Sequence, residues 1–341
     1  MRPRLGWIRY AGPLSEEEIE QAAGKFRAVI LQPWESDNAR RLREADPNIT
    51  VLAYKCLSSV RTYEQGPVYS SGISPAQAEQ LQSSVAAPEW AGYPGHVQQK
   101  VWDDAYQRAW VDSVTTELVA SGFDGVMADN DVYADYYGHG LNMEQVRAGL
   151  EAMLAQAGAS LRQHGLLLVP NIAESRRQPG RWARHARFGG GYEECWLGWG
   201  SANDGWLSVE DCLAQVAEMD REGLIIARVP GTGADDDPYL RLALAAAWVF
   251  LPHRDIAVTA TSHDGYHCMP LLAEAELDLG VAVGEVSAWR AAGVFSRRFQ
   301  HGMAVVNLGD HQVTFGYQRR LVTLPARSGR IFHSEQACDV E

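Results

Sequence analysis

The sequence is poor in cysteine and in positive charge, and both deficits exclude classes of protein. Its five cysteines are an odd number, lie far apart and include no CxxC pair, so neither a disulfide framework nor a structural zinc site is expected. The 341 residues carry 30 Lys and Arg against 43 Asp and Glu, a net charge of −13. This balance argues against a nucleic-acid partner and against an anionic membrane surface.

Long apolar runs and leader-like segments are also missing. No run of 18 apolar residues occurs, so we expect no membrane span. Residues 1–18 include basic side chains but no apolar core before the first acids, which is not the pattern of a signal peptide. We therefore expect a cytoplasmic protein with reduced thiols. The sequence also lacks a phosphate-binding loop, a GxSxG elbow and an HExxH motif, and nothing in it demands a cofactor.

What the sequence does contain is a regular alternation of strand-length apolar runs with helix-length segments. The runs lie at 5–10, 28–33, 49–57, 124–129, 166–173, 190–197, 223–230 and 255–262. Most are apolar throughout, as are parallel strands buried on both faces. Eight strands alternating with helices predict a (β/α)8 TIM barrel. An open doubly wound sheet is the alternative, and the absence of GxGxxG after an early strand disfavours it.

Two regions depart from this alternation. Residues 58–100 are rich in Ser, Gly, Pro and Gln and form a long connection after the third strand, and such connections are usually functional or disordered. Beyond residue 279, short β-runs that begin with 280–286 predict a small antiparallel β domain. The expected organisation is a barrel over 1–278 with the 58–100 insertion, a β domain over 279–335 and a frayed tail over 336–341.

The stretch SGFDGVMADND (121–131) carries the strongest candidate site. It reads as a helix stop and a buried strand, followed by Asp129, Asn130 and Asp131. Carboxylates at the carboxyl end of a parallel strand lie where barrel folds place their chemistry. Strand alternation makes Asp129 the inward-facing residue and Asp124 a structural one. The alternative is that Asp129 and Asp131 only cap the next helix.

A second acidic candidate follows the sixth strand. There Glu194 and Trp196 share one face, while Glu193 and Cys195 share the other. Cys195 suits burial beneath helices, which favours Glu194 at the barrel mouth, but a bulge would exchange Glu193 for Glu194, so both stay candidates. Two carboxylates facing a cleft are what glycoside hydrolysis needs, one as nucleophile or base and the other as general acid.

The other strand ends offer groups suited to holding a sugar. Aromatic rings stack on its apolar faces, and amides and charged groups bond its hydroxyls. The candidates for substrate contacts are Trp34, Lys55, Asp131, Asn171, Trp196, Arg228, His263 and Asp264. For the three tryptophans at strand ends (Trp34, Trp196 and Trp199), packing in the core is the equal alternative. His263 and His267 lie four residues apart, but further metal ligands are not evident, so we assign no metal site.

Taken together, these segments resemble the hypothetical glycosyl hydrolase-like family 15, a group of glycoside hydrolase barrels distantly related to α-glycosidase and dextranase-type families. The resemblance runs through most of the barrel. It is carried by VILQPWE (29–35), ITVLAYKCLSSV (49–60), PEW (88–90), the segment 106–131, PNIAES (170–175) and GGYEECW (190–196).

In related barrels the fourth-strand aspartate is the nucleophile and an acid near the sixth strand donates the proton. The resemblance therefore implies these roles for Asp129 and Glu194, and our leading hypothesis is a retaining glycoside hydrolase acting on an oligosaccharide or glycoside. The second hypothesis is a carbohydrate-binding barrel without catalysis. The third is a metal-dependent hydrolase using His263, His267 and the fourth-strand aspartates.

Overall fold

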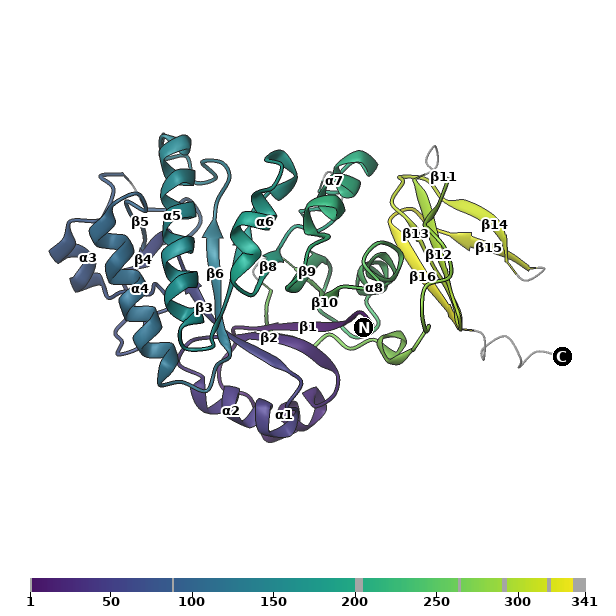
Figure 1. The fold of residues 1–341 in the computed structure, drawn as a ribbon, viewed down its shortest axis with the longest axis horizontal. Coiled ribbons are helices and arrows are strands. Elements are labelled where there is room, and N and C mark those ends of the chain that lie inside the picture. The colour runs from purple at the N-terminus through teal and green to yellow at the C-terminus, as the bar shows by residue number, and fades with distance from the viewer. Residues whose placement is uncertain are drawn as a thin grey trace. The chain divides into compact units, whose positions relative to one another are not determined.

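The computed structural model describes residues 2–87, 89–199, 205–262, 265–289, 293–317 and 320–333. Eight parallel strands close into a barrel in the order β1-β10-β9-β8-β7-β6-β3-β2 (Figure 1). Antiparallel sheets follow in the C-terminal part of the chain. The predicted TIM barrel with C-terminal antiparallel sheets is thus confirmed, and the open-sheet alternative is wrong.

Seven barrel strands match the predicted runs to within two residues at each end, but the sixth ends at Glu193, so the prediction that it extends to 197 is wrong. The barrel strands are β1 (Arg4–Arg9), β2 (Phe26–Leu31), β3 (Thr50–Cys56), β6 (Gly125–Asp131), β7 (Leu167–Ile172), β8 (Gly190–Glu193), β9 (Leu224–Pro230) and β10 (Asp255–Thr261). The helices are α1 (Glu16–Ala22), α2 (Ser36–Ala45), α3 (Pro75–Leu81), α4 (Asp104–Val119), α5 (Met143–Arg162), α6 (Arg181–His185), α7 (Val209–Met219) and α8 (Pro238–Phe250).

Local chemistry explains where these helices begin. Ser15 precedes α1, accepts a hydrogen bond from the backbone N–H of Glu18 at 3.2 Å, and donates its own N–H to the Glu18 carboxylate at 2.8 Å. This reciprocal capping box satisfies N–H groups that have no partner inside the helix. Ser208 caps α7 in a similar way through the N–H of Asp211. These polar caps set the starts of α1 and α7.

The chain folds into two compact units, which we describe separately. The N-terminal unit comprises Arg9–Ala23 and Ala28–Glu193, and the C-terminal unit comprises Met1–Ile8, Gly24–Arg27 and Glu194–Glu341. No helix within the described ranges is long and apolar enough to span a membrane.

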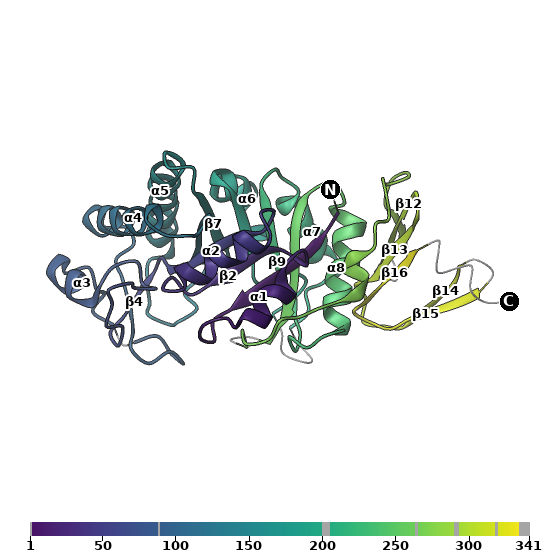
Figure 2. The ribbon, with the colours of Figure 1, turned by 90° about the horizontal axis from the view of Figure 1, so that it is seen from below.

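In the N-terminal unit, α4 and α5 pack side by side on the barrel strands (Figures 1 and 2). The connection after β3 is an ordered insertion: β4 (Ser59–Arg61) and β5 (His96–Gln98) form an antiparallel pair, and α3 lies between them in the chain. Gly72 closes this insertion against α4. Its φ is +81°, and a Cβ there would lie 2.2 Å from the indole nitrogen of Trp110, so only glycine fits.

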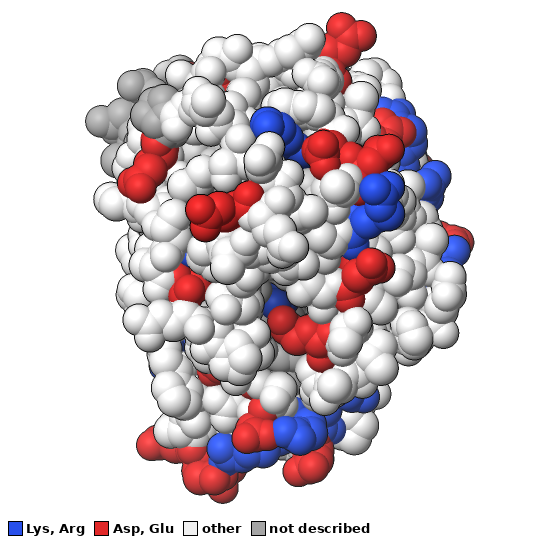
Figure 3. Space-filling view, turned by 90° about the vertical axis from the view of Figure 1, so that its left-hand side faces the viewer, with Lys and Arg blue, Asp and Glu red and all other residues white. Residues whose placement is uncertain are grey.

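The face of the molecule drawn in Figure 3 is mixed in charge. On the face shown in Figure 3, acidic and basic side chains are scattered among uncharged ones, and neither sign forms a continuous patch. The net negative charge of the chain is therefore not concentrated on that face.

In the C-terminal unit, β1 pairs in parallel with β10, so Arg4 lies opposite Ala257. The indole N–H of Trp7 donates to the carbonyl of Cys268 at 2.9 Å, and the Trp7 ring stacks on Phe26. The first residues of the chain are therefore built into the same core as residues near position 260.

The antiparallel sheets also belong to the C-terminal unit. Their strands are β11 (Ser287–Trp289), β12 (Val294–Phe299), β13 (Gly302–Asn307), β14 (Val313–Tyr317), β15 (Arg320–Leu324) and β16 (Ser328–His333). The predicted strand at 280–286 is wrong: only an isolated bridge at Ala282 occurs there, and the edge strand begins at Ser287. The two glycines in that segment, Gly280 and Gly284, both adopt positive φ, which an extended strand cannot accommodate.

Helix α8 is covered on all sides, since its residues from Leu242 to Phe250 are buried. Two aromatic contacts join it to the four-stranded sheet: Trp248 meets Phe299 edge-on with ring centroids 5.0 Å apart, and Phe250 lies 5.4 Å from Phe295. The sheet therefore completes the burial of an apolar helix of the barrel.

Candidate active site

Strand β6 ends in a β-bulge that separates its two aspartates. Its register with β7 shifts between Ala128 and Asp131, and Asn130 adopts a φ of +66°, in the left-handed region. A bulge of this kind re-aims the side chains that follow it and is common beside active sites. Strict alternation would put Asp129 and Asp131 on one face of the strand. Because of the bulge, the two side chains instead contact different groups.

Asp129 is half-buried and is held by neutral hydrogen-bond donors on both oxygens. Its Oδ2 accepts from the Tyr54 hydroxyl at 2.7 Å and from the Asn130 amide at 2.8 Å. Its Oδ1 accepts from the Asn171 amide at 2.9 Å. Hydrogen bonds to a carboxylate fix its orientation and favour its charged form. The three donors come from β3, β6 and β7, so the barrel itself positions this group.

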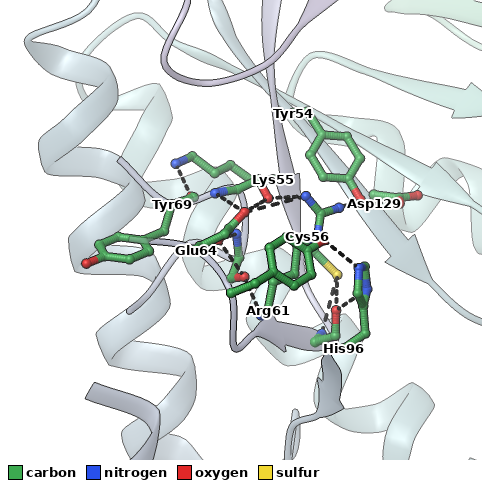
Figure 4. Close-up of polar contacts among 12 residues, drawn as sticks. Tyr54, Lys55, Cys56, Arg61, Glu64, Tyr69, His96 and Asp129 are labelled. Atoms are coloured by element: carbon green, nitrogen blue, oxygen red, sulfur yellow. Dashed lines mark hydrogen bonds and ion pairs between the residues drawn. The ribbon is translucent and has the colours of Figure 1, made fainter. Parts of the chain in front are cut away.

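Tyr54 connects Asp129 to the insertion (Figure 4). Its ring is buried, and its hydroxyl accepts a hydrogen bond from Arg61 Nη2 at 3.0 Å. Burial, together with the charge of Asp129, raises the pKa of Tyr54 well above its usual value. The phenol therefore keeps its proton and acts as a donor toward Asp129.

Asp131 lies in a buried ionic cluster with helix α6. Its Oδ1 accepts from Arg181 Nη2 at 2.9 Å, and its Oδ2 lies 2.5 Å from His185 Nδ1. Burial raises the pKa of Asp131, but the charges of His185 and Arg181 outweigh this and hold it below its usual value. The side chain has no exposed surface. Its predicted role as a substrate contact is not supported by this placement, because both oxygens are engaged inside the protein.

Lys55 is likewise withdrawn from solvent. It is fully buried, and its ammonium group donates to the carbonyl of Tyr69 at 2.6 Å and to Glu117 Oε2 at 2.7 Å. Burial lowers the pKa of Lys55 and raises that of Glu117, while each charge offsets part of the effect on the other. This pair fastens β3 to α4, and the placement does not support Lys55 as a substrate contact.

The two glutamates after the sixth strand have different environments. In the N-terminal unit, Glu193 ends β8 and is buried, with Oε2 3.5 Å from the Ser175 hydroxyl. In the C-terminal unit, Glu194 is half-buried in the turn that follows, and its Oε1 accepts from the Tyr266 hydroxyl at 2.7 Å. Of the two, Glu194 is the carboxylate with access to solvent.

Two further candidates in the C-terminal unit are buried. Arg228 donates to the carbonyl of Glu194 at 3.0 Å and, at 2.8 Å, to both the hydroxyl and the carbonyl of Thr261. Trp196 is 0% exposed. Both placements are structural, because neither side chain reaches the surface, and a direct sugar contact by either is not supported.

The remaining candidates fall into two groups. Trp34, after β2, is 52% exposed, and Trp199 is 37% exposed, so both rings are open to a ligand. His263 and Asp264 lie outside the described residues. Among the residues that are described, no group of three His, Cys, Asp or Glu side chains is arranged to hold a metal ion.

From the end of the third strand, which offers Tyr54 and Lys55, sequence reasoning selected Lys55, although alternation along the strand favours Tyr54. Along β3 and β6, Tyr54 lies opposite Met127, and Lys55 lies opposite Ala128. Because Met127 shares the face of Asp129, the same alternation applied to β3 would have selected Tyr54 as inward-facing and Lys55 as outward-facing. No comparable signal exists for Arg61, which reaches Tyr54 only through the fold of the insertion.

A family model described as hypothetical glycosyl hydrolase family 15 matches residues 43–303. No curated protein matches the chain in sequence. A noncanonic maltogenic alpha-amylase, AmyB from Thermotoga neapolitana, is similar in structure with a TM-score of 0.54 and 10% identity, over 97% of this chain and 96% of that one. Ega3 from Aspergillus fumigatus, in complex with galactosamine, has a TM-score of 0.53 and 10% identity, over 78% and 93% of the two chains. At such identities these two structures show a shared fold.

Proposed function

The chain belongs to hypothetical glycosyl hydrolase family 15, and from this premise we propose that it is a retaining glycoside hydrolase with Asp129 as nucleophile and Glu194 as general acid and base. The observation that carries the proposal is the environment of Asp129. Asp129 is half-buried, and both oxygens of its carboxylate accept hydrogen bonds from neutral donors. The carboxylate of Asp131, in contrast, is buried and contacts Arg181 and His185.

The proposed reaction has two steps and needs no cofactor. Asp129 attacks the anomeric carbon of a sugar while Glu194 protonates the departing glycosidic oxygen. Glu194 then takes a proton from water, the water attacks the anomeric carbon, and Asp129 is released. The Tyr266 hydroxyl, which donates to Glu194 Oε1 at 2.7 Å, would hold this side chain in place through both steps.

The substrate class proposed is an oligosaccharide or glycoside. The exposed rings of Trp34 and Trp199 support it, because aromatic faces suit the apolar faces of sugars. Ega3, which shares the fold, was crystallised with galactosamine, so amino sugars belong in the substrate panel.

The first test compares Asp129→Asn with wild type on aryl α- and β-glycosides and on oligosaccharides. We expect the variant to lose turnover and azide to restore it in Asp129→Gly, since azide can replace the missing nucleophile. Asp112→Asn, an exposed aspartate of α4, is the matched control and should behave as wild type. Undiminished turnover in Asp129→Asn would refute the assignment.

The second test separates Glu194 from Glu193. Glu194→Gln should lower kcat/KM by on the order of 10²–10⁴ for poor leaving groups. It should affect activated leaving groups much less at the first step, because they need no proton. Glu193→Gln should leave that dependence on leaving group unchanged. If only Glu193→Gln produces the dependence, Glu193 is the acid; if wild type binds sugars but hydrolyses none, the protein is a carbohydrate-binding barrel.

A further inference from the structure

A chain of hydrogen bonds links the insertion after β3 to the candidate nucleophile. Arg61, the last residue of β4, donates from Nη2 to the Tyr54 hydroxyl at 3.0 Å, and that hydroxyl donates to Asp129 Oδ2 at 2.7 Å (Figure 4). The Arg61 guanidinium also lies 5.1 Å from the centre of the Tyr54 ring. A residue of the insertion is thus one hydroxyl group away from Asp129.

The direction of this hydrogen-bond chain is fixed by chemistry. An arginine side chain has only donors, so the Tyr54 oxygen must accept from Arg61. The single proton of the phenol is then directed to Asp129, which as a carboxylate can only accept. Burial and the charge of Asp129 raise the pKa of Tyr54, which keeps that proton in place. Without Arg61, the hydroxyl would be free to rotate toward other acceptors.

Arg61 is itself held in place by Glu64, Ser70 and Ser71 of the insertion. Its Nη1 lies 3.5 Å from Glu64 Oε1 and also donates to the Ser70 hydroxyl, and its backbone N–H donates to the Ser71 hydroxyl at 2.8 Å. Glu64 accepts further hydrogen bonds from the backbone of Ser70 at 3.2 Å and from the Ser71 hydroxyl at 2.9 Å. Two nearly buried charges are therefore aligned within the insertion, an arrangement that costs desolvation unless it is well bonded.

We propose that Arg61 is a positioning residue for the reaction. It orients the Tyr54 hydroxyl toward Asp129, and this hydrogen bond favours the charged form of the Asp129 carboxylate. The proposal rests on the proposed function of Asp129. It makes the insertion part of the catalytic machinery, and removing Arg61 acts on Asp129 only through Tyr54.

Among the described residues of the N-terminal unit, Tyr63, Glu64 and His96 interact electrostatically with Arg61, and Cys56 and Tyr10 interact with Tyr54. The Cys56 thiol lies on the same strand as Tyr54, and burial, with the charge of Asp129, raises its pKa, so it stays protonated. The Tyr10 ring meets Tyr54 edge-on. Asp131 faces Arg181 and His185. Because Arg61 bonds to the hydroxyl that bonds to Asp129, removing this cation should change the titration of Asp129.

The experiment compares Arg61→Met, Tyr54→Phe, the double variant and the control Arg108→Met, an exposed arginine of α4. Two quantities are measured: the acid limb of the kcat/KM profile, and the ¹³C carboxyl titration of Asp129, assigned with Asp129→Asn. In Arg61→Met and Tyr54→Phe the acid limb and the titration should both move up by about one unit, since each loses support for the charged form. We expect kcat to fall about tenfold, as for a lost hydrogen bond to a charged group, with KM little changed.

The double variant shows whether Arg61 and Tyr54 act on Asp129 through one chain or independently. If both residues act through one chain, its shift equals that of Tyr54→Phe alone, whereas independent effects would add. An additive result, or an unchanged Asp129 titration in Arg61→Met, overturns the proposal. Should Arg61→Met fold poorly because Glu64 loses its partner, Arg61→Met/Glu64→Gln removes both charges and must give the same shift.

The two readouts also separate this proposal from the proposed function. A shifted Asp129 titration in a protein without glycosidase activity shows that Arg61 acts on Asp129 through Tyr54 but refutes the hydrolase, and with it a role of Arg61 in that reaction. Activity that requires Asp129 but is unaffected by Arg61→Met and by Tyr54→Phe supports the hydrolase and refutes the positioning role.

Discussion

Asp131→Asn should destabilise the protein strongly, although the residue lies only two positions from Asp129. The substitution keeps the shape of the side chain but removes the charge that faces Arg181 Nη2 at 2.9 Å and His185 Nδ1 at 2.5 Å. Arg181 is 1% exposed and would keep only neutral acceptors among the described residues, namely the new amide oxygen and backbone carbonyls at 2.8 Å and 3.2 Å. Breaking a buried pair from one side costs about 3–5 kcal/mol, because the remaining charge stays buried without its counterion.

This cost is a large share of the stability of a typical protein, which is about 5–15 kcal/mol. For a chain of this length each kcal/mol lowers Tm by roughly 2 °C, so the expected decrease is roughly 6–10 °C. The midpoint of urea unfolding should fall with an unchanged slope. Asp129→Asn is the control, since its carboxylate is half-exposed and accepts from neutral donors, and its Tm should stay close to wild type.

The pH dependence supplies an independent check. The pKa of Asp131 is lower in the folded protein than its ordinary value of 3.8, so its contribution to stability is fully present above pH 3.8 and is lost as the pH falls through the lower, folded value. Wild type and Asp131→Asn should therefore differ most near neutral pH and converge in acid. Equal stability of Asp131→Asn and Asp129→Asn at pH 7 would refute this reading of the cluster.

Three further predictions follow from other parts of the structure. Gly329→Ala should cost about 1–3 kcal/mol, because a Cβ there would lie 2.6 Å from the Cβ of Ala245; a Tm equal to wild type would show that β16 can shift away from α8. Removal of 279–341 should give an insoluble protein, because it exposes the outer face of α8; a soluble, folded barrel would contradict this. Burial and the charge of Arg61 lower the pKa of His96 to about 4, so NMR should find this side chain neutral at pH 5. The folded protein should lose stability as the pH falls from 6.5 toward 4, because over this range only the unfolded chain binds a proton at His96. A His96 titration near pH 6.5 would contradict both expectations.

The fold could be predicted from the sequence because its signals are local. Apolar runs of strand length and caps such as Ser15 with Glu18 lie within a few residues of the elements they specify. The strand at 280–286 was mispredicted because alternation of apolar residues outweighed Gly280 and Gly284, whose positive φ bends the chain there. Local patterns thus located the barrel better than the irregular edge of the appended sheet.

The site could be predicted only in part, because its decisive contacts are not local. Alternation predicts that Asp129 faces inward, but it cannot foresee a bulge at Asn130, so Asp131 was also chosen as a site residue. The partners of Asp131 come from α6, about 50 residues later, and Arg61 meets Tyr54 only after the insertion folds back on β3. Lys55 was chosen for its charge, whereas its burial against Glu117 depends on helix packing.

The pairing of β1 with β10 has a consequence for the order of events during synthesis. Arg4 and Ala257 are partners in the C-terminal unit, yet about 250 residues of chain are made between them. At about 5–20 residues per second, the ribosome needs roughly 12–50 s to supply the partner of the first strand. Throughout that interval β1 can pair only with β2, and its other edge, which later pairs with β10, stays open to chaperones. The barrel can therefore close between β1 and β10 only after nearly all of its other strands have been made.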